Sequence, residues 1–206
     1  MKVFCALALF CPFLSACAAP KVDGPVIIGN KAPPTMKIVH KPASRTVALE
    51  SAGVKALTPE NTSAYMDNQA REIGKRLEFN KDFRLARNAY DIVIVAQSEF
   101  AFKEDGLQLS VDFEAAMKHL SSVMITFDRT AITITGHTDS NGSEHFNQSV
   151  SEFRADAISD ALRSNGVLAM RIRTAGEGEA LPAASNKSSK GRSRNNRMEI
   201  RVSPIT

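Results

Sequence analysis

The stretch GHTDSNGSEHFNQSVSEFRA, residues 136–155, indicates both how the chain folds and where two of its charges meet. It follows the strand pattern AITIT, residues 131–135, in which isoleucines alternate with threonines. The stretch opens with a loop that holds Asp139 between two glycines, and Arg154 follows fifteen residues later inside a helical pattern. A strand that passes through such a loop into a helix is typical of an α/β fold.

Arg154 lies on the helix face that we expect to pack on the core. At 100° per residue it falls within an apolar stripe made of Val150, Phe153, Ala157, Ile158, Ala161 and Leu162. A guanidinium in such a stripe is costly unless it is paired and hydrogen-bonded, and Asp139 is the obvious acidic partner. The two residues therefore form either a private salt bridge or a socket for a ligand that carries both charges.

A zwitterionic ligand fits the socket hypothesis. Ligands bind in open α/β sheets at the carboxyl ends of strands, which is where Asp139 lies, and the helix start adds free N–H groups that favour anionic atoms. Asp139 is then expected to bind an ammonium, and Arg154 to bind a carboxylate in fork geometry.

Further elements are expected on both sides of this stretch. The patterns predict a lead-in helix over 58–78, a hairpin around 88–90, strands at 92–96, 131–135, 171–175 and 197–202, and helices over 110–124 and 143–164. From residue 92 onward the order is strand, helix, strand, helix, strand, strand. This order predicts an α/β sandwich, βαβαββ, with helices packed on one mixed sheet.

The N-terminus has the features of an export signal. Residues 1–17, MKVFCALALFCPFLSAC, contain Lys2 and then an apolar run that is shorter than the roughly 20 residues needed to span a bilayer. The ending Leu-Ser-Ala-Cys resembles a bacterial lipoprotein signal, which implies removal of residues 1–16 and acylation of Cys17 with lipid such as palmitate. Ala18 replaces the aspartate that retains such proteins in the inner membrane, which implies the outer membrane, facing the periplasm. An ordinary cleavage site with an incidental cysteine is the alternative.

Residues 17–57 are expected to be the lipidated cysteine and a flexible tether, because proline, glycine and lysine are scattered there without helical or strand period. About 40 such residues reach about 130 Å when fully extended. The formal net charge is +4, or +3 once Lys2 is removed, and the one dense basic run is KSSKGRSRNNR at 187–197. That run has no interleaved aromatic residues, so nucleic acid is not an expected partner.

Several dispersed motifs resemble the OmpA-like, or peptidoglycan-associated, domain. They are GHTDSNG at 136–142, Asn147, SVSEFRA at 149–155, GEGEALPAASN at 176–186 and GRSRNNRMEI at 191–200. The resemblance covers about residues 91–203, which predicts an OmpA-like domain at 91–206 preceded by a lead-in helix and hairpin at 58–90. Two positions depart from the family pattern. Val150 replaces a usual leucine, and Asn196 replaces the first arginine of an Asn-Arg-Arg run, which is expected to remove one cationic contact at the rim.

The resemblance implies a non-catalytic domain that needs no cofactor and binds the diaminopimelate of the peptidoglycan stem peptide. By position, Asp139 and Arg154 are the primary ligands, and Thr138, Asn147 and Arg197 shape the loop or contact the peptide. The expected function is that of an outer-membrane lipoprotein that links the membrane noncovalently to the cell wall. The alternative is an envelope docking or signalling module whose main partner is another protein.

Three other kinds of site are weaker. His137, His145 and Asp139 lack the fixed short spacing of a strong zinc motif, so no metal is expected. His137 and Ser140 lie on one loop, and their closeness in sequence is no test of a nucleophile and base. GEGEAL at 176–181 lacks the third glycine of a dinucleotide fingerprint and is expected to form a tight turn.

Overall fold

The computed structural model describes residues 49–77, 81–104 and 106–206. The predicted signal peptide, Cys17 and the tether up to residue 48 lie outside the described residues. Within the described ranges, no helix combines the length and the apolar composition that a membrane crossing requires.

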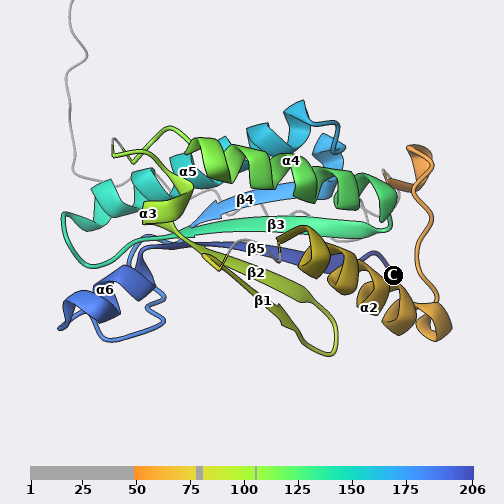
Figure 1. Cartoon of the computed structure of the whole chain (residues 1–206), viewed down its shortest axis with the longest axis horizontal. Helices are drawn as coiled ribbons and strands as arrows, with labels where there is room; N and C mark the ends of the chain where they lie inside the picture. The colour runs from red at the N-terminus through yellow and green to blue at the C-terminus, as the bar shows by residue number, and fades with distance from the viewer. Residues whose placement is uncertain (1–48, 78–80, 105) are drawn as a thin grey trace, which may run out of the picture. The chain divides into compact units, whose positions relative to one another are not determined.

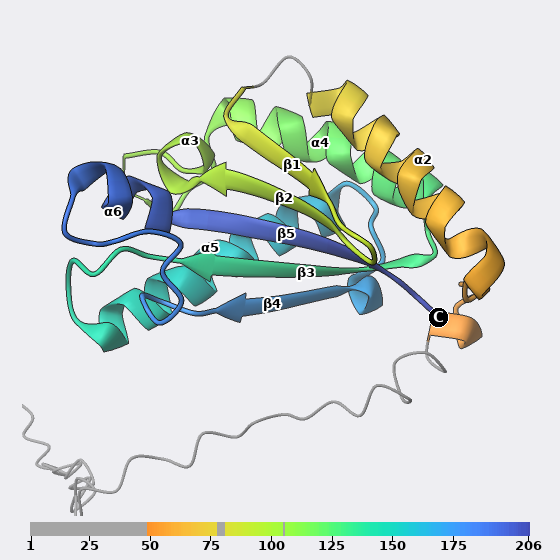
Figure 2. The ribbon, with the colours of Figure 1, turned by 90° about the horizontal axis from the view of Figure 1, so that it is seen from below.

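Five strands form one mixed sheet in the order β1-β2-β5-β3-β4 (Figures 1 and 2). The strands are β1 (Phe83–Arg87), β2 (Ile92–Gln97), β3 (Thr130–His137), β4 (Ile172–Gly176) and β5 (Arg197–Pro204). β3 and β4 run parallel, and every other neighbouring pair in the sheet is antiparallel. The predicted α/β fold with helices on one mixed sheet is confirmed.

The three long helices are α2 (Pro59–Leu77), α4 (Val111–Thr126) and α5 (Glu144–Ser164). α4 and α5 lie over the same face of the sheet (Figure 1). Three short elements after β2 were not predicted: α3 (Ser98–Ala101), the 3-10 turn η1 (Ala169–Arg171) and α6 (Ser189–Asn195). α6 is built from part of the basic run, and the Ser188 hydroxyl caps it by accepting from the Gly191 amide at 3.1 Å.

Local signals define the ends of the long helices as the sequence indicates. Ser110 and Ser143 each cap a helix, because their hydroxyls accept from the amides of Phe113 and Phe146, both at 3.2 Å. Gly166 ends α5 with φ of 98°, a left-handed conformation that glycine adopts without strain. The Ser143 cap thus fixes where the loop before α5 ends.

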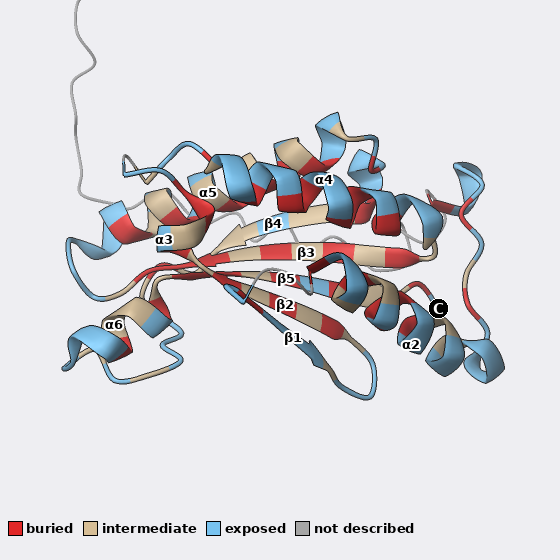
Figure 3. Ribbon diagram, viewed as in Figure 1, coloured by how far each residue is buried: buried red, intermediate tan, exposed pale blue. Residues whose placement is uncertain are grey.

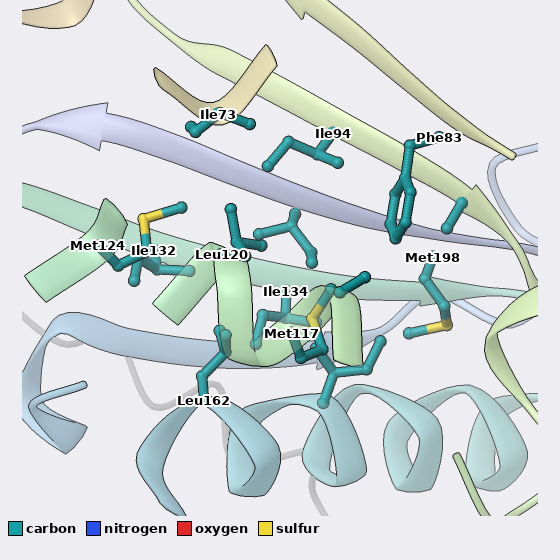
Figure 4. Close-up of a cluster of buried hydrophobic side chains, with 14 of the residues drawn as sticks. Ile73, Phe83, Ile94, Met117, Leu120, Met124, Ile132, Ile134, Leu162 and Met198 are labelled. Carbon is teal, nitrogen blue, oxygen red and sulfur yellow. The ribbon is translucent and has the colours of Figure 1, made fainter. Parts of the chain in front are cut away.

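The core lies between the helices and the inward face of the sheet. Burial alternates along the central strands, as the banding of β3 shows (Figure 3). Figure 4 shows the centre of the core, where sheet and helix side chains meet: Ile94, Ile132, Ile134 and Met198 from the strands, and Met117, Leu120, Met124 and Leu162 from α4 and α5. Ile73 of α2 and Phe83 of β1 belong to the same core. α2 and β1 of the predicted lead-in segment therefore pack together with the residues that follow them.

Residues 49–57, which we expected to be the end of the tether, pack against the C-terminus instead. Leu49 and Val54 are buried with Ile205, and the Leu57 amide donates to the Ile205 carbonyl at 2.7 Å. The sequence pattern missed this packing because three apolar residues at irregular spacing have neither helical nor strand period. Residues 49–57 are thus part of the folded chain.

The buried face of α5 differs from the predicted stripe. Phe153 is 52% exposed, whereas the side buried on the sheet carries Asn147, Ser151, Ala155, Ile158, Ser159 and Leu162. The reason is close backbone packing: a Cβ added at Gly136 of β3 would overlap the Ser151 carbonyl oxygen, and one at Gly176 would lie 2.5 Å from the Ser151 hydroxyl. Small residues, not the most apolar ones, therefore face the sheet near the start of α5.

Candidate functional site

The loop between β3 and α5 lies at the same end of the sheet as α3 and α6 (Figure 1). Asp139 is partly exposed in this loop, and its Oδ1 accepts from the Asn141 amide at 2.8 Å. This local turn holds the carboxylate at the loop surface.

Asn147 and Thr138 fix the loop rather than extend into solvent. The buried Asn147 amide group donates to the Asp139 carbonyl at 3.2 Å and to Glu179 Oε2 at 2.6 Å. The Thr138 amide donates to the Gly178 carbonyl at 2.9 Å. Both residues thus hold the Asp139 loop against residues 177–179.

Arg154 is half-buried, and neutral groups hold its guanidinium. Nε donates to the Gly106 carbonyl at 2.8 Å, and Nη1 donates to Asn196 Oδ1 at 2.9 Å. Cζ lies 5.2 Å from the centre of the Phe102 ring, within the range of a cation–π contact. Burial lowers the pKa of Arg154 and the negative charge of Asp139 opposes that effect, while an arginine stays charged at any physiological pH.

The hypothesis of a private salt bridge is wrong. Asp139 and Arg154 are both described, and they share neither an ion pair nor a hydrogen bond. The charge of Asp139 still acts on Arg154 through space. The carbonyl, the amide oxygen and the aromatic ring supply the partners that a half-buried guanidinium requires. The positive charge of Arg154 is therefore stabilised without being neutralised.

Arg154 opens into a groove of about 420 Å³ between α5 and the segment that follows β2. Phe102, Gly106 and Asn196 line it beside the guanidinium, and the charged residues Glu99, Lys103 and Glu104 complete its walls. Among the described residues, the groove lining thus combines two cationic side chains, Arg154 and Lys103, with two anionic ones, Glu99 and Glu104, a balance that suits a dipolar ligand.

Arg197 and His137 lie next to each other on β5 and β3, behind the site. Arg197 is buried, with its guanidinium 2.9 Å from Glu199 Oε1 and a further donation to the Asn195 carbonyl at 3.3 Å. His137 is 3% exposed, and neither ring nitrogen has a hydrogen-bond partner within the described part of the chain. Burial and the Arg197 charge lower the pKa of His137 to about 4, although Glu199 acts in the opposite direction. These residues lie at the ends of two interior strands, and the bonds of Arg197 leave it little freedom to contact a ligand.

The structure thus places four of the five predicted residues in two groups, and Arg197 lies apart from them in the sheet. Asp139, Thr138 and Asn147 share one loop system, and Arg154 lies beside it in the groove. Sequence reasoning missed Phe102, Gly106 and Asn196 as partners of Arg154. The departure from the family pattern at Asn196 was the one signal that pointed toward them.

These features define a class of protein before any comparison: an α/β domain with helices on one face of a mixed sheet and a charged groove at one sheet end. The model of the OmpA family matches residues 101–196, so the chain contains an OmpA family domain. No metal-ligating cluster of three His, Cys, Asp or Glu residues occurs within the described ranges.

Two curated relatives are similar to the chain in sequence, and one solved structure is similar to it in fold. "Probable lipoprotein YiaD" of Escherichia coli is 31% identical over 141 residues, which cover 68% of this chain and 64% of the relative. "Peptidoglycan-binding protein ArfA" of Mycobacterium tuberculosis is 36% identical over 109 residues, covering 52% of this chain and 33% of the relative. The chain therefore spans less than two thirds of either relative. The crystal structure of a putative MotB-like protein from Desulfovibrio vulgaris shares the fold at a TM-score of 0.62 and 22% identity, covering 70% of this chain and 97% of that one.

Proposed function

We propose that the chain binds peptidoglycan noncovalently through the diaminopimelate of the stem peptide. The observation that carries the proposal is the state of Arg154: a half-buried guanidinium that neutral acceptors hold and that lines a groove. An arginine held in this way keeps its full charge for an anionic ligand. A relative named as peptidoglycan-binding, 36% identical over 109 residues, supports the choice of ligand.

The two charged groups of the ligand are assigned to separate residues. Arg154 binds the side-chain carboxylate of diaminopimelate, and Asp139, partly exposed at the loop surface, binds the ammonium. Thr138 and Asn147 hold the Asp139 loop in place through Gly178 and Glu179. Arg197 contributes indirectly, because its buried ion pair with Glu199 supports the end of β5 next to the end of β3, where the Asp139 loop begins.

We further propose that the protein links the outer membrane to the wall through lipid on Cys17. The Leu-Ser-Ala-Cys sequence and the curated name of the E. coli relative, a lipoprotein, support this role. A diacylglyceryl group and an amide-linked acyl chain on Cys17 would bury dozens of methylenes in the membrane at about 0.8 kcal/mol each, which makes anchoring effectively permanent.

Sedimentation with isolated cell-wall sacculi tests the proposal. The full chain in mild detergent is expected to sediment with purified sacculi and to be released by soluble muropeptides that contain diaminopimelate. A chain that stays in the supernatant, and sediments only when another envelope protein is added, would show that the domain is instead a protein-docking module.

A further inference from the structure

Asn196 occupies a rigid position between α6 and β5. Its amide donates to the Arg192 carbonyl at 3.0 Å, and its carbonyl accepts from the Ser98 amide at 3.0 Å. Because both backbone groups of Asn196 are bonded, the side chain starts from a fixed point. Its Oδ1 accepts from Arg154 Nη1 at 2.9 Å.

This contact helps to set the orientation of the Arg154 guanidinium. A guanidinium is planar and carries five N–H groups in a fixed fork. One N–H of Arg154 goes to Gly106 and one to Asn196, while the Phe102 ring packs near Cζ. Two bonds from different atoms of one rigid plane remove most of its freedom to rotate. Within the described part of the chain, the remaining three N–H groups have no hydrogen-bond partner.

The chemistry of Asn196 also matters, because its side chain accepts a hydrogen bond without carrying charge. A carboxylate at this position would pair with Arg154 and compete with an anionic ligand. An aliphatic side chain would leave Nη1 without its acceptor and the guanidinium free to turn. An amide is therefore the side chain that orients Arg154 and leaves its charge available.

We propose that Asn196 is a positioning residue that makes the groove selective for a carboxylate. It acts through Arg154, and the preference of the protein for diaminopimelate over lysine in the stem peptide depends on it. The inference rests on the proposed function, because it assigns the source of selectivity at the same site.

The experiment compares the affinities of two muropeptides that differ only in diaminopimelate or lysine, measured by titration calorimetry on the full chain. The wild-type chain is expected to prefer diaminopimelate by about tenfold to a hundredfold, the range for a charge-assisted hydrogen bond. Asn196→Ala is expected to lower the affinity for the diaminopimelate peptide by about tenfold and to leave the lysine peptide unchanged. The ratio of the two affinities then falls about tenfold.

Asn196→Asp distinguishes positioning from simple structural support. The new carboxylate pairs with Arg154, so the melting temperature is expected to stay level or rise while the preference for diaminopimelate collapses. A merely structural role would change stability and both affinities in the same direction.

Asn68 offers a matched control. Its Oδ1 accepts from Arg71 Nη1 at 3.0 Å on the exposed face of α2, so Asn68→Ala and Asn68→Asp make the same chemical changes outside the groove. These variants are expected to retain the wild-type ratio. An unchanged ratio in both Asn196 variants, with a wild-type chain that prefers diaminopimelate, overturns the inference but not the proposed function. A wild-type chain that binds neither peptide overturns both.

Discussion

Replacing Asp139 tests whether this carboxylate binds a ligand or stabilises the fold. Asp139→Asn removes the charge and keeps the side-chain oxygen that accepts from the Asn141 amide. Since no ion pair joins Asp139 to Arg154, loss of the charge leaves no stranded partner. We therefore expect a change of less than about 1 kcal/mol in the free energy of unfolding, as for exposed charges. For a domain of this size that corresponds to a shift of at most about 2–4 °C in melting temperature.

Asp139→Ala also removes the turn hydrogen bond, which adds about 0.5–1.5 kcal/mol of destabilisation. Breaking a buried salt bridge would cost about 3–5 kcal/mol, or roughly 6–20 °C. Thermal unfolding thus separates the two cases, and sedimentation with sacculi reports binding in the same samples. Both variants are expected to lose wall binding while they keep their fold.

Asp160→Asn is the matched control, since Asp160 is an exposed carboxylate of α5 that pairs with Arg163 at 3.0 Å. It is expected to bind sacculi like the wild type. The ligand role of Asp139 is refuted if Asp139→Asn melts more than about 6 °C below the wild type and still sediments with sacculi, because that combination belongs to a structural bridge.

Three further predictions concern stability and processing. His137 stays neutral in the folded chain down to a pH of about 4, whereas in the unfolded chain it binds a proton near pH 6.5, so the free energy of unfolding falls as the pH drops from 6.5 toward 4. The loss is up to about 3 kcal/mol. Urea unfolding at both pH values should show that the free energy of unfolding of His137→Gln depends less on pH than that of the wild type. Gly136→Ala should lower the free energy of unfolding by about 1–3 kcal/mol in thermal melts, because its Cβ would overlap the Ser151 carbonyl. Gly74→Ala is the control: Gly74 lies inside α2, a Cβ there would contact Leu85 of β1 at 3.6 Å, and the change should be neutral or stabilising. Mass spectrometry of the membrane fraction should find Cys17 at the N-terminus with its lipid, and an unmodified Cys17 in a detergent-free soluble fraction would contradict the anchor.

Sequence reasoning recovered the parts of the fold that local rules control. Ser110, Ser143 and Gly166 mark helix ends through their own side chains or backbone freedom, and the alternation along β3 follows from one buried face. The buried side of α5 could not be predicted from apolarity alone. Its orientation depends on how closely the backbones of α5 and β3 approach at Gly136, which is a tertiary contact.

The partners of Arg154 also could not be predicted from the sequence, for a different reason. Gly106 contributes a backbone carbonyl, an acceptor that every residue type carries, and it lies 48 positions away in sequence. Asn196 lies 42 positions away on another element. From the sequence we could infer that an arginine on a buried helix face needs hydrogen-bond acceptors. An acidic residue is the partner that a sequence suggests first, because opposite charges attract. This bias led to Asp139 as the structural partner, although neutral groups fill that role.

Arg154 therefore has two tasks that a single deletion cannot separate. It ties Gly106 and Asn196 to α5, and it presents its charge to the groove. Removing Arg154 would lose both the tie and the charge, so a loss of binding in such a variant is no proof of ligand contact. The surrounding residues resolve the ambiguity because their substitutions alter the charges while the tie of Arg154 to Gly106 and residue 196 is kept. Asp139→Asn removes the charge that faces the ammonium of the ligand and leaves the contacts of Arg154 intact. Asn196→Asp strengthens those contacts, but its carboxylate pairs with Arg154 and neutralises the positive charge. If wall binding fails in both while the fold survives, the charges of Asp139 and Arg154, and not the structural contacts of Arg154, are what the wall recognises.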